Sequence, residues 1–467
     1  MKKFILVVIL SACFSQIWGQ ADHQEIGSLV THMLPQSSEV GVYAYDLTAD
    51  KVVCAYQHQK LCRPASTLKL LTAVTALSEL DDDKKPFRTE VWTNGVIRND
   101  TLYGNLHVVG GFDPEFDDQA MDLLVRDLST LSFSVITGKV YADISMKDSL
   151  YWGSGWAWDD NPEAFQPYLS PLMFNKGVVK VTAMPSAVSG RPAKLRCVPQ
   201  SSYYVVRNRT LTQSPDAGRF TVSRDWLKNG NTITVSGNVD RPTVGWVNVY
   251  SSSDFFMETL LERLRAKGIR VPSSFVYAPL GRRDHIRCLA SHDTSLQEVV
   301  NQLMKESDNL NGQALLCRLG VEGSRKKGVS DKDGIVELQK MIRLLGHDPA
   351  DYQVVDGCGL SNYNYITPQL LVDLLRYAYS REELFARLSL SLPIAGVDGT
   401  LKNRMKNSPA YNNVRAKTGS FTAINTLAGY LKRGDGHVIA FAIMNQNILS
   451  AAKARAFQDR VCISLCK

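Results

Sequence analysis

Short apolar runs separated by polar turns stand near both ends of the chain, as strands with buried side chains require. Residues 41–47 and 52–56 are two apolar runs on either side of a polar turn, which predicts two strands. Residues 420–430 and 438–443 repeat this pattern around the turn 432–436, which predicts an antiparallel pair. Strands therefore stand at both ends of the sequence.

The pattern of apolar and polar residues changes twice in the middle of the chain. Residues 68–77 are apolar and rich in helix formers, which predicts a helix close behind Pro64. From about 86 to 271 short alternating runs are separated by turn signals such as Asn94-Gly95, so this region is predicted to be mostly β. Residues 254–267 form an amphipathic helix near its end, and helices dominate after Asp293.

This order of elements predicts an α+β fold, with one antiparallel sheet packed by helices and a large, mostly β insertion. The chain of 467 residues is too long for one ordinary core. We expect a first catalytic part at 22–85, the insertion at 86–280, in one or two subdomains, and a second catalytic part at 281–467. Residues 1–21 are expected to be a signal peptide.

The first residues predict export. Lys2 and Lys3 precede an apolar run at 4–10 that is too short to span a bilayer. Cleavage after Gly19 or Ala21 would leave a protein in the periplasm or cell envelope. An alternative is lipid anchoring through Cys13, because residues 10–13 resemble a lipobox. No later stretch of sequence predicts a transmembrane helix.

Composition and cysteine spacing limit the kinds of partner and cofactor that this chain is expected to bind. The chain is 44% hydrophobic and 21% charged, and its formal charge of +7 forms no dense Lys/Arg block, so nucleic-acid binding is not expected. The nine cysteines form no zinc-binding pattern, and no metal or cofactor is expected. Export would permit disulfides, and Cys54 and Cys62 are candidates for a pair, but we expect most cysteines to be buried.

Three short strings carry the chemistry: Ser66-Thr67-Leu68-Lys69, Ser307-Asp308-Asn309 and Lys417-Thr418-Gly419. Together they supply a nucleophile with a base one helical turn away, a second hydroxyl with an amide, and a cationic strand. This is the set of groups that a lysine-assisted serine acyl-transferase needs. On a helix, positions i and i+3 share a face, so Lys69 should lie beside Ser66.

Each string has a plainer interpretation when it is taken alone. Ser-x-x-Lys occurs three more times, beginning at Ser324, Ser450 and Ser464. Ser66 could be a helix N-cap beside a surface lysine, and Ser307-Asp308-Asn309 could only cap the next helix. The order of all three strings, each in suitable local structure, favours the catalytic interpretation.

Four further stretches, with the three strings, resemble the exported D-alanyl-D-alanine carboxypeptidases/endopeptidases of the penicillin-binding protein 4 type, the low-molecular-mass class C group. These stretches are residues 110–114, 155–160, 356–361 and 391–400. The resemblance covers most of the mature chain, and the large insertion is typical of the group. It implies a β-lactamase/transpeptidase-like catalytic domain that acts on peptidoglycan stem peptides and is acylated by β-lactams.

The resemblance also implies a role for each site residue. Ser66 would be the nucleophile, Lys69 its preferred base, Asn309 would orient Lys69 and hold the substrate amide, and Ser307 would pass a proton to the leaving amine. The substrate-binding residues would be Asp308, Lys417, Thr418, Gly419 and Ser420, and the backbone N–H groups of Ser66 and Ser420 would form the oxyanion hole. Asp159 and Asp160 are candidates for the border of the cleft.

The sequence departs from the family pattern at three places. Gly312-Gln313 stands where an Ala-Glu pair is usual, Cys358 replaces a serine, and Asn362 stands where relatives often carry a basic residue. The last departure leaves the preferred stem-peptide residue open.

Two alternative functions stay open at this point. A β-lactamase or esterase on the same scaffold would differ in how fast its acyl-enzyme hydrolyses. A non-catalytic cell-wall-binding protein would not need all five of the proposed catalytic residues. The sequence also leaves open whether the enzyme trims terminal D-alanine, cuts crosslinks or does both.

Overall fold

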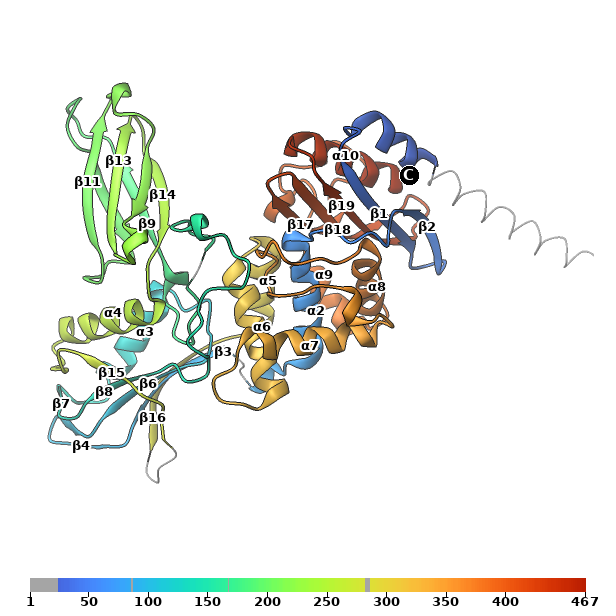
Figure 1. Cartoon of the computed structure of the whole chain (residues 1–467). Coiled ribbons are helices and arrows are strands. Elements are labelled where there is room, and N and C mark those ends of the chain that lie inside the picture. Colours follow the sequence, from blue (N-terminus) through green and yellow to red (C-terminus); the bar gives the residue numbers. More distant parts are fainter. Residues whose placement is uncertain (1–23, 85–86, 167, 282–285) are drawn as a thin grey trace, which may run out of the picture. The chain divides into compact units, whose positions relative to one another are not determined.

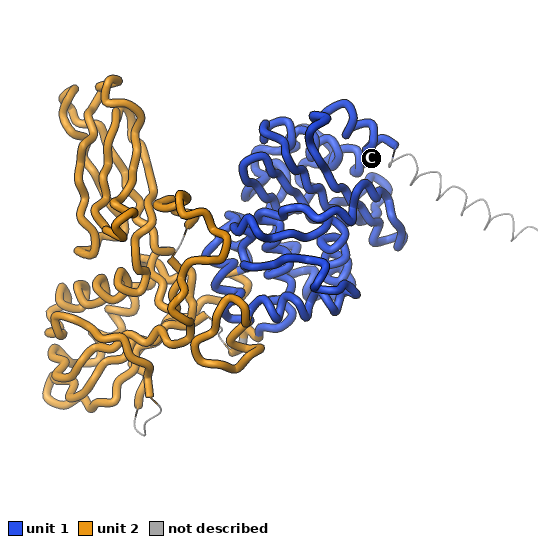
Figure 2. The backbone as a smooth tube through the Cα atoms, viewed as in Figure 1, with its two compact units in different colours: residues 1–80, 300–319, 334–467 blue, residues 81–299, 320–333 orange. Residues whose placement is uncertain are grey.

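The structure, a computed structural model, describes residues 24–84, 87–166, 168–281 and 286–467. The expected signal segment 1–21 and Cys13 lie outside these ranges. The described residues form two compact units (Figure 2). Unit 1 contains the described residues up to 80 together with 300–319 and 334–467, and unit 2 contains 81–299 and 320–333.

Unit 1 is built on a five-stranded sheet in the order β17-β18-β19-β1-β2, and every neighbouring pair is antiparallel. Its strands are β1 (Glu39–Asp46), β2 (Lys51–Tyr56), β17 (Arg415–Phe421), β18 (Ile424–Lys432) and β19 (Val438–Gln446). β1 pairs with β19, so the two ends of the sequence meet inside one sheet (Figure 1). The strands predicted at 41–47, 52–56 and 438–443 are confirmed. The range 420–430, predicted as one strand, is divided between β17 and β18 by a turn at 422–423.

Helices cover both faces of this sheet. On one face, Val42 and Ile443 pack with Phe457 of α10 (Ala451–Leu465) and with Ile26 of the helical residues 24–33. On the other face, α8 (Pro368–Tyr379) contacts β1, β18 and β19, and α2 (Lys69–Glu79) packs on α8 and α9 (Glu382–Ser391). The remaining long helices are α5 (Leu296–Lys305), α6 (Asn309–Ser324) and α7 (Asp331–Leu344). This is the expected α+β arrangement.

Unit 2 contains a second five-stranded sheet, in the order β15-β8-β6-β3-β16. Its strands are β3 (Phe87–Thr93), β6 (Leu106–Gly110), β8 (Val140–Asp143), β15 (Phe275–Tyr277) and β16 (Arg287–Thr294), and a smaller sheet joins β4 (Val96–Arg98), β5 (Thr101–Tyr103) and β7 (Val135–Ile136). The helices α3 (Asp118–Ser129) and α4 (Ser252–Ala266) belong to the same core. The sequence predicted α4 but not α3.

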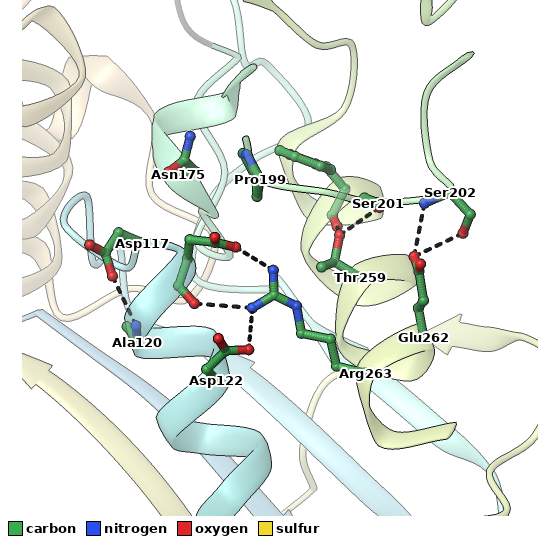
Figure 3. A network of polar contacts seen from close by, with 12 residues as sticks. Asp117, Ala120, Asp122, Asn175, Pro199, Ser201, Ser202, Thr259, Glu262 and Arg263 are labelled. Carbon is green, nitrogen blue, oxygen red and sulfur yellow. Dashed lines mark hydrogen bonds and ion pairs between the residues drawn. The ribbon is translucent and has the colours of Figure 1, made fainter. Parts of the chain in front are cut away.

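The two helices of unit 2 are joined by charge pairs. Arg263 of α4 donates to the carboxylate of Asp122 at 2.6 Å and to both the backbone oxygen and the carboxylate of Asp118, all on α3 (Figure 3). On α4 itself, the Glu262 carboxylate accepts from the backbone N–H of Ser202 at 2.8 Å and from its hydroxyl at 3.0 Å (Figure 3).

The rest of unit 2 is a sandwich of two three-stranded sheets. The first has the order β10-β9-β14 and the second β11-β13-β12. Their strands are β9 (Val178–Met184), β10 (Lys194–Val198), β11 (Val205–Thr212), β12 (Thr221–Arg224), β13 (Thr232–Val239) and β14 (Thr243–Asn248). The inward side chains Val179, Val181, Ile233 and Val235 are buried, and a Cβ at Gly245 of the first sheet would lie only 2.5 Å from Val222 of the second.

The observed units begin and end at different residues from the domains expected. The expected insertion ran from 86 to 280, whereas unit 2 begins at Asp81, continues to Val299 and also takes in 320–333. Backbone pairing explains much of the difference, because β16 lies antiparallel to β3 and therefore belongs to the same sheet. Residues 287–294 were expected in the second catalytic part.

A buried carboxylate joins two segments of unit 2. Asp113 is fully buried; it accepts from the Thr294 hydroxyl at 2.7 Å and lies 2.7 Å from His292 Nδ1. The hydrogen bond to Asp113 raises the pKa of His292, against the effect of burial, and the charges of Asp117 and Asp293 add to the rise. Protonated His292 therefore stabilises the folded unit.

We expect His292→Asn to lower the Tm of the protein more at pH 5.5 than at pH 8.5. A histidine whose pKa is higher in the folded than in the unfolded state stabilises fully below its unfolded pKa of about 6.5, and this contribution is lost as the pH rises through the folded pKa. Thermal unfolding of both proteins at the two pH values measures it. Equal Tm differences at the two pH values would contradict the role given to His292.

Candidate active site

The Ser66 hydroxyl and the Lys69 amine are held together by one tight turn. Ser66 lies in the short 3-10 helix η1 (Ala65–Leu68), and Lys69 begins α2 directly after it. Lys69 Nζ lies 2.9 Å from Ser66 Oγ, and Lys69 has no exposed surface. The alternative of an N-cap serine beside a surface lysine is wrong, because Pro64 occupies the N-cap and the lysine is buried.

Two more acceptors surround the Lys69 amine. Asn309 Oδ1 lies at 2.7 Å and the backbone oxygen of Cys358 at 2.5 Å from Lys69 Nζ. The three acceptors come from segments separated by up to 289 positions in the sequence. The sequence predicted the contact with Asn309 but not the one with the Cys358 carbonyl.

Ser307 and Asp308 form the link between α5 and α6, as predicted. Ser307 adopts a left-handed conformation, with φ of +60°, and is half-buried. Asp308 Oδ1 accepts from the backbone N–H of Asn311 at 3.1 Å, so this carboxylate also caps α6. The capping interpretation holds for Asp308, whereas Asn309 points its side-chain oxygen at Lys69 Nζ.

β17 carries the third string along the edge of the sheet, and its Lys417 is fully buried. Lys417 Nζ lies 2.8 Å from Ser307 Oγ and 2.7 Å from the Thr418 backbone oxygen. A Cβ at Gly419 would come within 2.9 Å of the Ser66 backbone nitrogen and 2.8 Å of the Pro64 oxygen. Only glycine therefore lets this strand approach the Ser66 turn so closely.

The outer part of β17 is more open. Thr418 is half-buried and Ser420 is exposed. Thr418 Oγ1 donates to Thr400 Oγ1 at 2.8 Å, which adds a residue that the sequence did not identify as functional. The segment that carries Thr400 is fixed by Asp398, which pairs with Lys305 Nζ at 2.6 Å and accepts from the Ile394 N–H at 2.8 Å.

The loop at 356–361 aims the Cys358 carbonyl at Lys69. Buried Asp356 accepts from the backbone N–H groups of Gly359 and Ser361, each at 2.7 Å. Gly359 has a φ of +78°, and a Cβ there would lie 2.0 Å from the Ala65 backbone oxygen. The loop thus rests directly against the turn that holds Ser66.

The departures from the family pattern meet at this loop. A Cβ at Gly312 would lie 2.8 Å from the Cβ of Cys358, and Gln313 Oε1 accepts from the Gly357 N–H at 2.6 Å. Asn362 is also close by, and its backbone oxygen accepts from Arg63 Nε at 3.1 Å.

Burial controls the protonation of both lysines. Loss of hydration lowers the pKa of the Lys69 amine, while the charges of Cys358, Asp356 and Asp308 oppose this effect. The pKa of Lys417 lies well below its usual range because of burial and because of the charge on Lys69. Two amines in one dry site repel each other when both are charged, so the site favours a state in which one is neutral.

The two aspartates predicted at the border of the cleft belong to unit 2. Asp159 and Asp160 lie in unit 2, in the 3-10 helix η3 (Trp158–Asp160), so their place at the border of the cleft stays a prediction. Burial, followed by the charges of Asp159 and Glu163, raises the pKa of Asp160.

Six of the eight cysteines in the described ranges are buried: Cys54, Cys62, Cys317, Cys358, Cys462 and Cys466.

The described residues include no metal-binding cluster and no membrane-spanning helix. Among them, no group of three or more His, Cys, Asp or Glu side chains is placed to hold a metal ion. In the same part of the chain, none of the helices combines the length and the apolar character needed to cross a bilayer.

The chain is similar to known carboxypeptidases over almost its full length. Residues 24–464 match the D-Ala-D-Ala carboxypeptidase 3 (S13) family. The D-alanyl-D-alanine carboxypeptidase of Actinomadura sp. (strain R39) is 29% identical over 460 residues, which cover 95% of this chain and 84% of the relative. The carboxypeptidase DacB of Haemophilus influenzae is 27% identical, over 88% of this chain and 86% of its own.

Solved structures agree with this assignment at the level of the fold. Penicillin binding protein 4 from Haemophilus influenzae superposes with a TM-score of 0.81 at 24% identity, covering 95% of this chain and 99% of that one. The same protein in complex with a β-lactam gives a TM-score of 0.75 at 23% identity. With the family match and the three strings in one site, the chain belongs to the S13 family and is a serine-type D-Ala-D-Ala carboxypeptidase of the penicillin-binding protein 4 type.

Proposed function

We propose that Ser66 is the nucleophile that attacks the carbonyl between the two D-alanines of a peptidoglycan stem peptide. The observation that carries this assignment is the 2.9 Å separation of Ser66 Oγ from the buried amine of Lys69. Ser66 is itself half-buried, so its hydroxyl is accessible to a substrate. Attack forms an ester between Ser66 and the shortened peptide, with terminal D-alanine as the leaving group.

Lys69 takes the proton from the Ser66 hydroxyl during this attack. A free lysine, with a pKa of about 10.4, is a poor base at neutral pH. Burial lowers the pKa of Lys69, which favours the neutral amine that the step requires. Hydrogen bonds to Asn309 Oδ1 and to the Cys358 carbonyl orient the Lys69 amine. Its third contact is then with the Ser66 hydroxyl.

The substrate itself completes the charge balance. Its terminal carboxylate would bind at Lys417 and Thr418, where a charge-assisted hydrogen bond contributes roughly 1.5–3 kcal/mol. A negative charge beside Lys417 raises the pKa of that amine. The resulting cation then disfavours a second charge on Lys69, so substrate binding itself promotes the neutral base.

Ser307 connects Lys417 to the leaving group. Its hydroxyl lies 2.8 Å from Lys417 Nζ, so it can give its proton to the departing amine while it receives one from Lys417. The backbone N–H groups of Ser66 and Ser420 would stabilise the oxyanion, and the close approach at Gly419 brings these two segments together. Asp308 lies beside these groups on the same link.

Water then hydrolyses the ester and frees Ser66. A β-lactam would acylate the same hydroxyl, because its strained amide presents a carbonyl to the same groups. The Haemophilus influenzae relative has been crystallised with a β-lactam. None of these steps calls for a metal or a cofactor.

Crosslink cleavage is a second candidate activity at the same site. The resemblance includes endopeptidases, and a crosslink differs from a stem terminus only in the group attached beyond the scissile bond. Digestion of purified crosslinked and uncrosslinked muropeptides separates the two activities, because only an endopeptidase releases monomers from the crosslinked substrate.

Export to the cell envelope is consistent with this substrate. We base it on the charged and apolar pattern of the first residues, and lipid anchoring through Cys13 is the alternative to cleavage after Gly19 or Ala21. N-terminal sequencing of the secreted protein decides between them, since a lipoprotein begins at a modified cysteine.

Ser66→Ala should abolish covalent labelling by fluorescent penicillin and the release of D-alanine, because the acceptor oxygen is removed. The substitution removes one half-buried oxygen, so the Tm should change by no more than a few degrees. Labelling that persists in this variant would place the nucleophile at another residue.

Lys69→Ala should lower the acylation rate by at least about a hundredfold, the usual contribution of a general base. In the unmodified protein, the acylation rate should rise with pH and level off below the usual lysine pKa, because burial lowers the pKa of Lys69. Stopped-flow acylation between pH 5 and 10 tests both points. A near-normal rate in the variant would exclude Lys69 as the base.

Thr400→Val should raise KM for a D-Ala-D-Ala peptide about two- to tenfold with little change in kcat. The hydrogen bond from Thr418 would be lost, and such a bond contributes about 0.5–1.5 kcal/mol. Thr400→Ser keeps the hydroxyl and serves as the matched control. If both variants behave alike, the hydroxyl of Thr400 does not orient Thr418.

A further inference from the structure

The positive charge of the chain is concentrated in the sandwich of unit 2. Residues 178–248 hold ten of the 53 Lys and Arg residues and only three of the 46 Asp and Glu residues, so this segment alone carries a formal charge of +7. That equals the charge of the whole chain, so all other residues together are balanced. The charge is thus concentrated in this segment, although its cations form no dense block along the sequence.

Within the sandwich, the basic and acidic residues occupy different places. None of the six sandwich strands, β9 to β14, contains an acidic residue, and the three aspartates lie between the strands. The strands carry six basic residues. One of these, Arg224, is buried and donates to Asn161, Tyr168, Gly230 and Asn248. The other five are exposed: Lys180, Lys194, Arg196, Arg207 and Arg209.

Three of the exposed cations share the outer face of the first sheet. Register places Lys194 opposite Met184 and Arg196 opposite Thr182, and Lys180 stands opposite the half-exposed Trp246. Neighbours two positions apart on a strand are separated by about 7 Å, so the three cations form a compact group beside an aromatic ring.

The second sheet presents a similar outer face. Arg207 and Arg209 of β11 lie opposite Thr234 and Ser236 of β13, and Thr221 of β12 lies opposite Ser236. This face combines two arginines with a row of hydroxyl groups. Within the described ranges, none of the five exposed cations forms a side-chain hydrogen bond or an ion pair with another residue.

Nearby carboxylates do not neutralise this surface. Arg196 also lines a cavity of about 470 Å3 whose wall includes Asp118, Asp122 and Glu262. The two aspartates are bound by Arg263, and the glutamate is bound by Ser202 (Figure 3). Of the five exposed cations, only Arg196 lines this cavity.

We propose that the sandwich of β9 to β14 is a docking surface for peptidoglycan strands, which it binds through the carboxylates of the stem peptides. This rests on the family assignment, which makes peptidoglycan the substrate. Stem carboxylates recur along a glycan strand and match rows of cations free of acidic neighbours. Trp246 offers a flat apolar ring of the kind against which sugar rings pack. The surface would hold the insoluble polymer independently of catalysis.

Cosedimentation with purified sacculi tests the proposal, using the full chain with Ser66→Ala so that no turnover occurs. The first variant carries Lys180→Glu, Lys194→Glu and Arg196→Glu, and we expect it to bind at least about tenfold more weakly than its parent. The second variant carries Arg207→Glu and Arg209→Glu, with an expected loss of about threefold. Exposed ion pairs contribute little singly, so several must be reversed together.

The matched control reverses the same number of exposed charges in unit 1. Lys453→Glu, Arg455→Glu and Arg460→Glu on α10 change the net charge as the first variant does, and sacculus binding should stay within twofold of the parent. Binding of the parent should also fall steeply between 50 and 500 mM NaCl, because salt screens exposed charges.

Several results would overturn the proposal. They are an equal loss in the α10 control, unchanged binding in both sandwich variants, binding that salt does not weaken, and a preference for vesicles of anionic lipid over sacculi. With Ser66 intact, the sandwich variants should release D-alanine from a soluble peptide at the normal rate. If the protein with Ser66 intact lacks that activity while its Ser66→Ala form still binds sacculi, the proposed function fails and the docking surface does not.

Discussion

Two lysine amines without solvent exposure lie at the centre of the catalytic unit, and the rest of its structure serves to keep them there. Burying an ammonium group is costly unless hydrogen bonds replace its water. Lys69 has contacts with Ser66, Asn309 and Cys358, and Lys417 has contacts with Ser307 and Thr418. The cost of dehydration that remains lowers both pKa values, which favours the neutral form of each amine.

Local sequence predicted the parts of this site that depend on local geometry. The i, i+3 spacing placed Lys69 beside Ser66, and the helical pattern placed Ser307 between helices. The predicted strand at 420–430 left out Lys417, which lies on β17. Local sequence could not predict the Cys358 carbonyl or Thr400. Every residue has a carbonyl, and no periodic pattern marks the one that will face a lysine 289 positions away. For the same reason β16 was assigned to the wrong side of a boundary, since its pairing with β3 is set by tertiary structure.

Two of the departures from the family pattern belong together. Cys358 and Gly312 are distant in sequence, yet a Cβ at position 312 would lie 2.8 Å from that of Cys358. The missing side chain at 312 makes room for the loop that presents the Cys358 carbonyl. Taken one at a time, each difference is the loss of a residue that is usual in the family. In the structure, positions 312 and 358 contact each other beside Lys69.

Because β1 pairs with β19, the sheet of unit 1 cannot be completed until the C-terminal part of the chain is present. A ribosome releases the nucleophile turn early, but the strand that closes its sheet is among the last segments to be made. Until then the inner edge of β1 exposes unpaired backbone groups, while unit 2 has nearly all of its own strands at hand. Lys69, Asn309 and Lys417 all precede β19, so a chain cut short before β19 still contains them but lacks the strand that pairs with both β1 and β18.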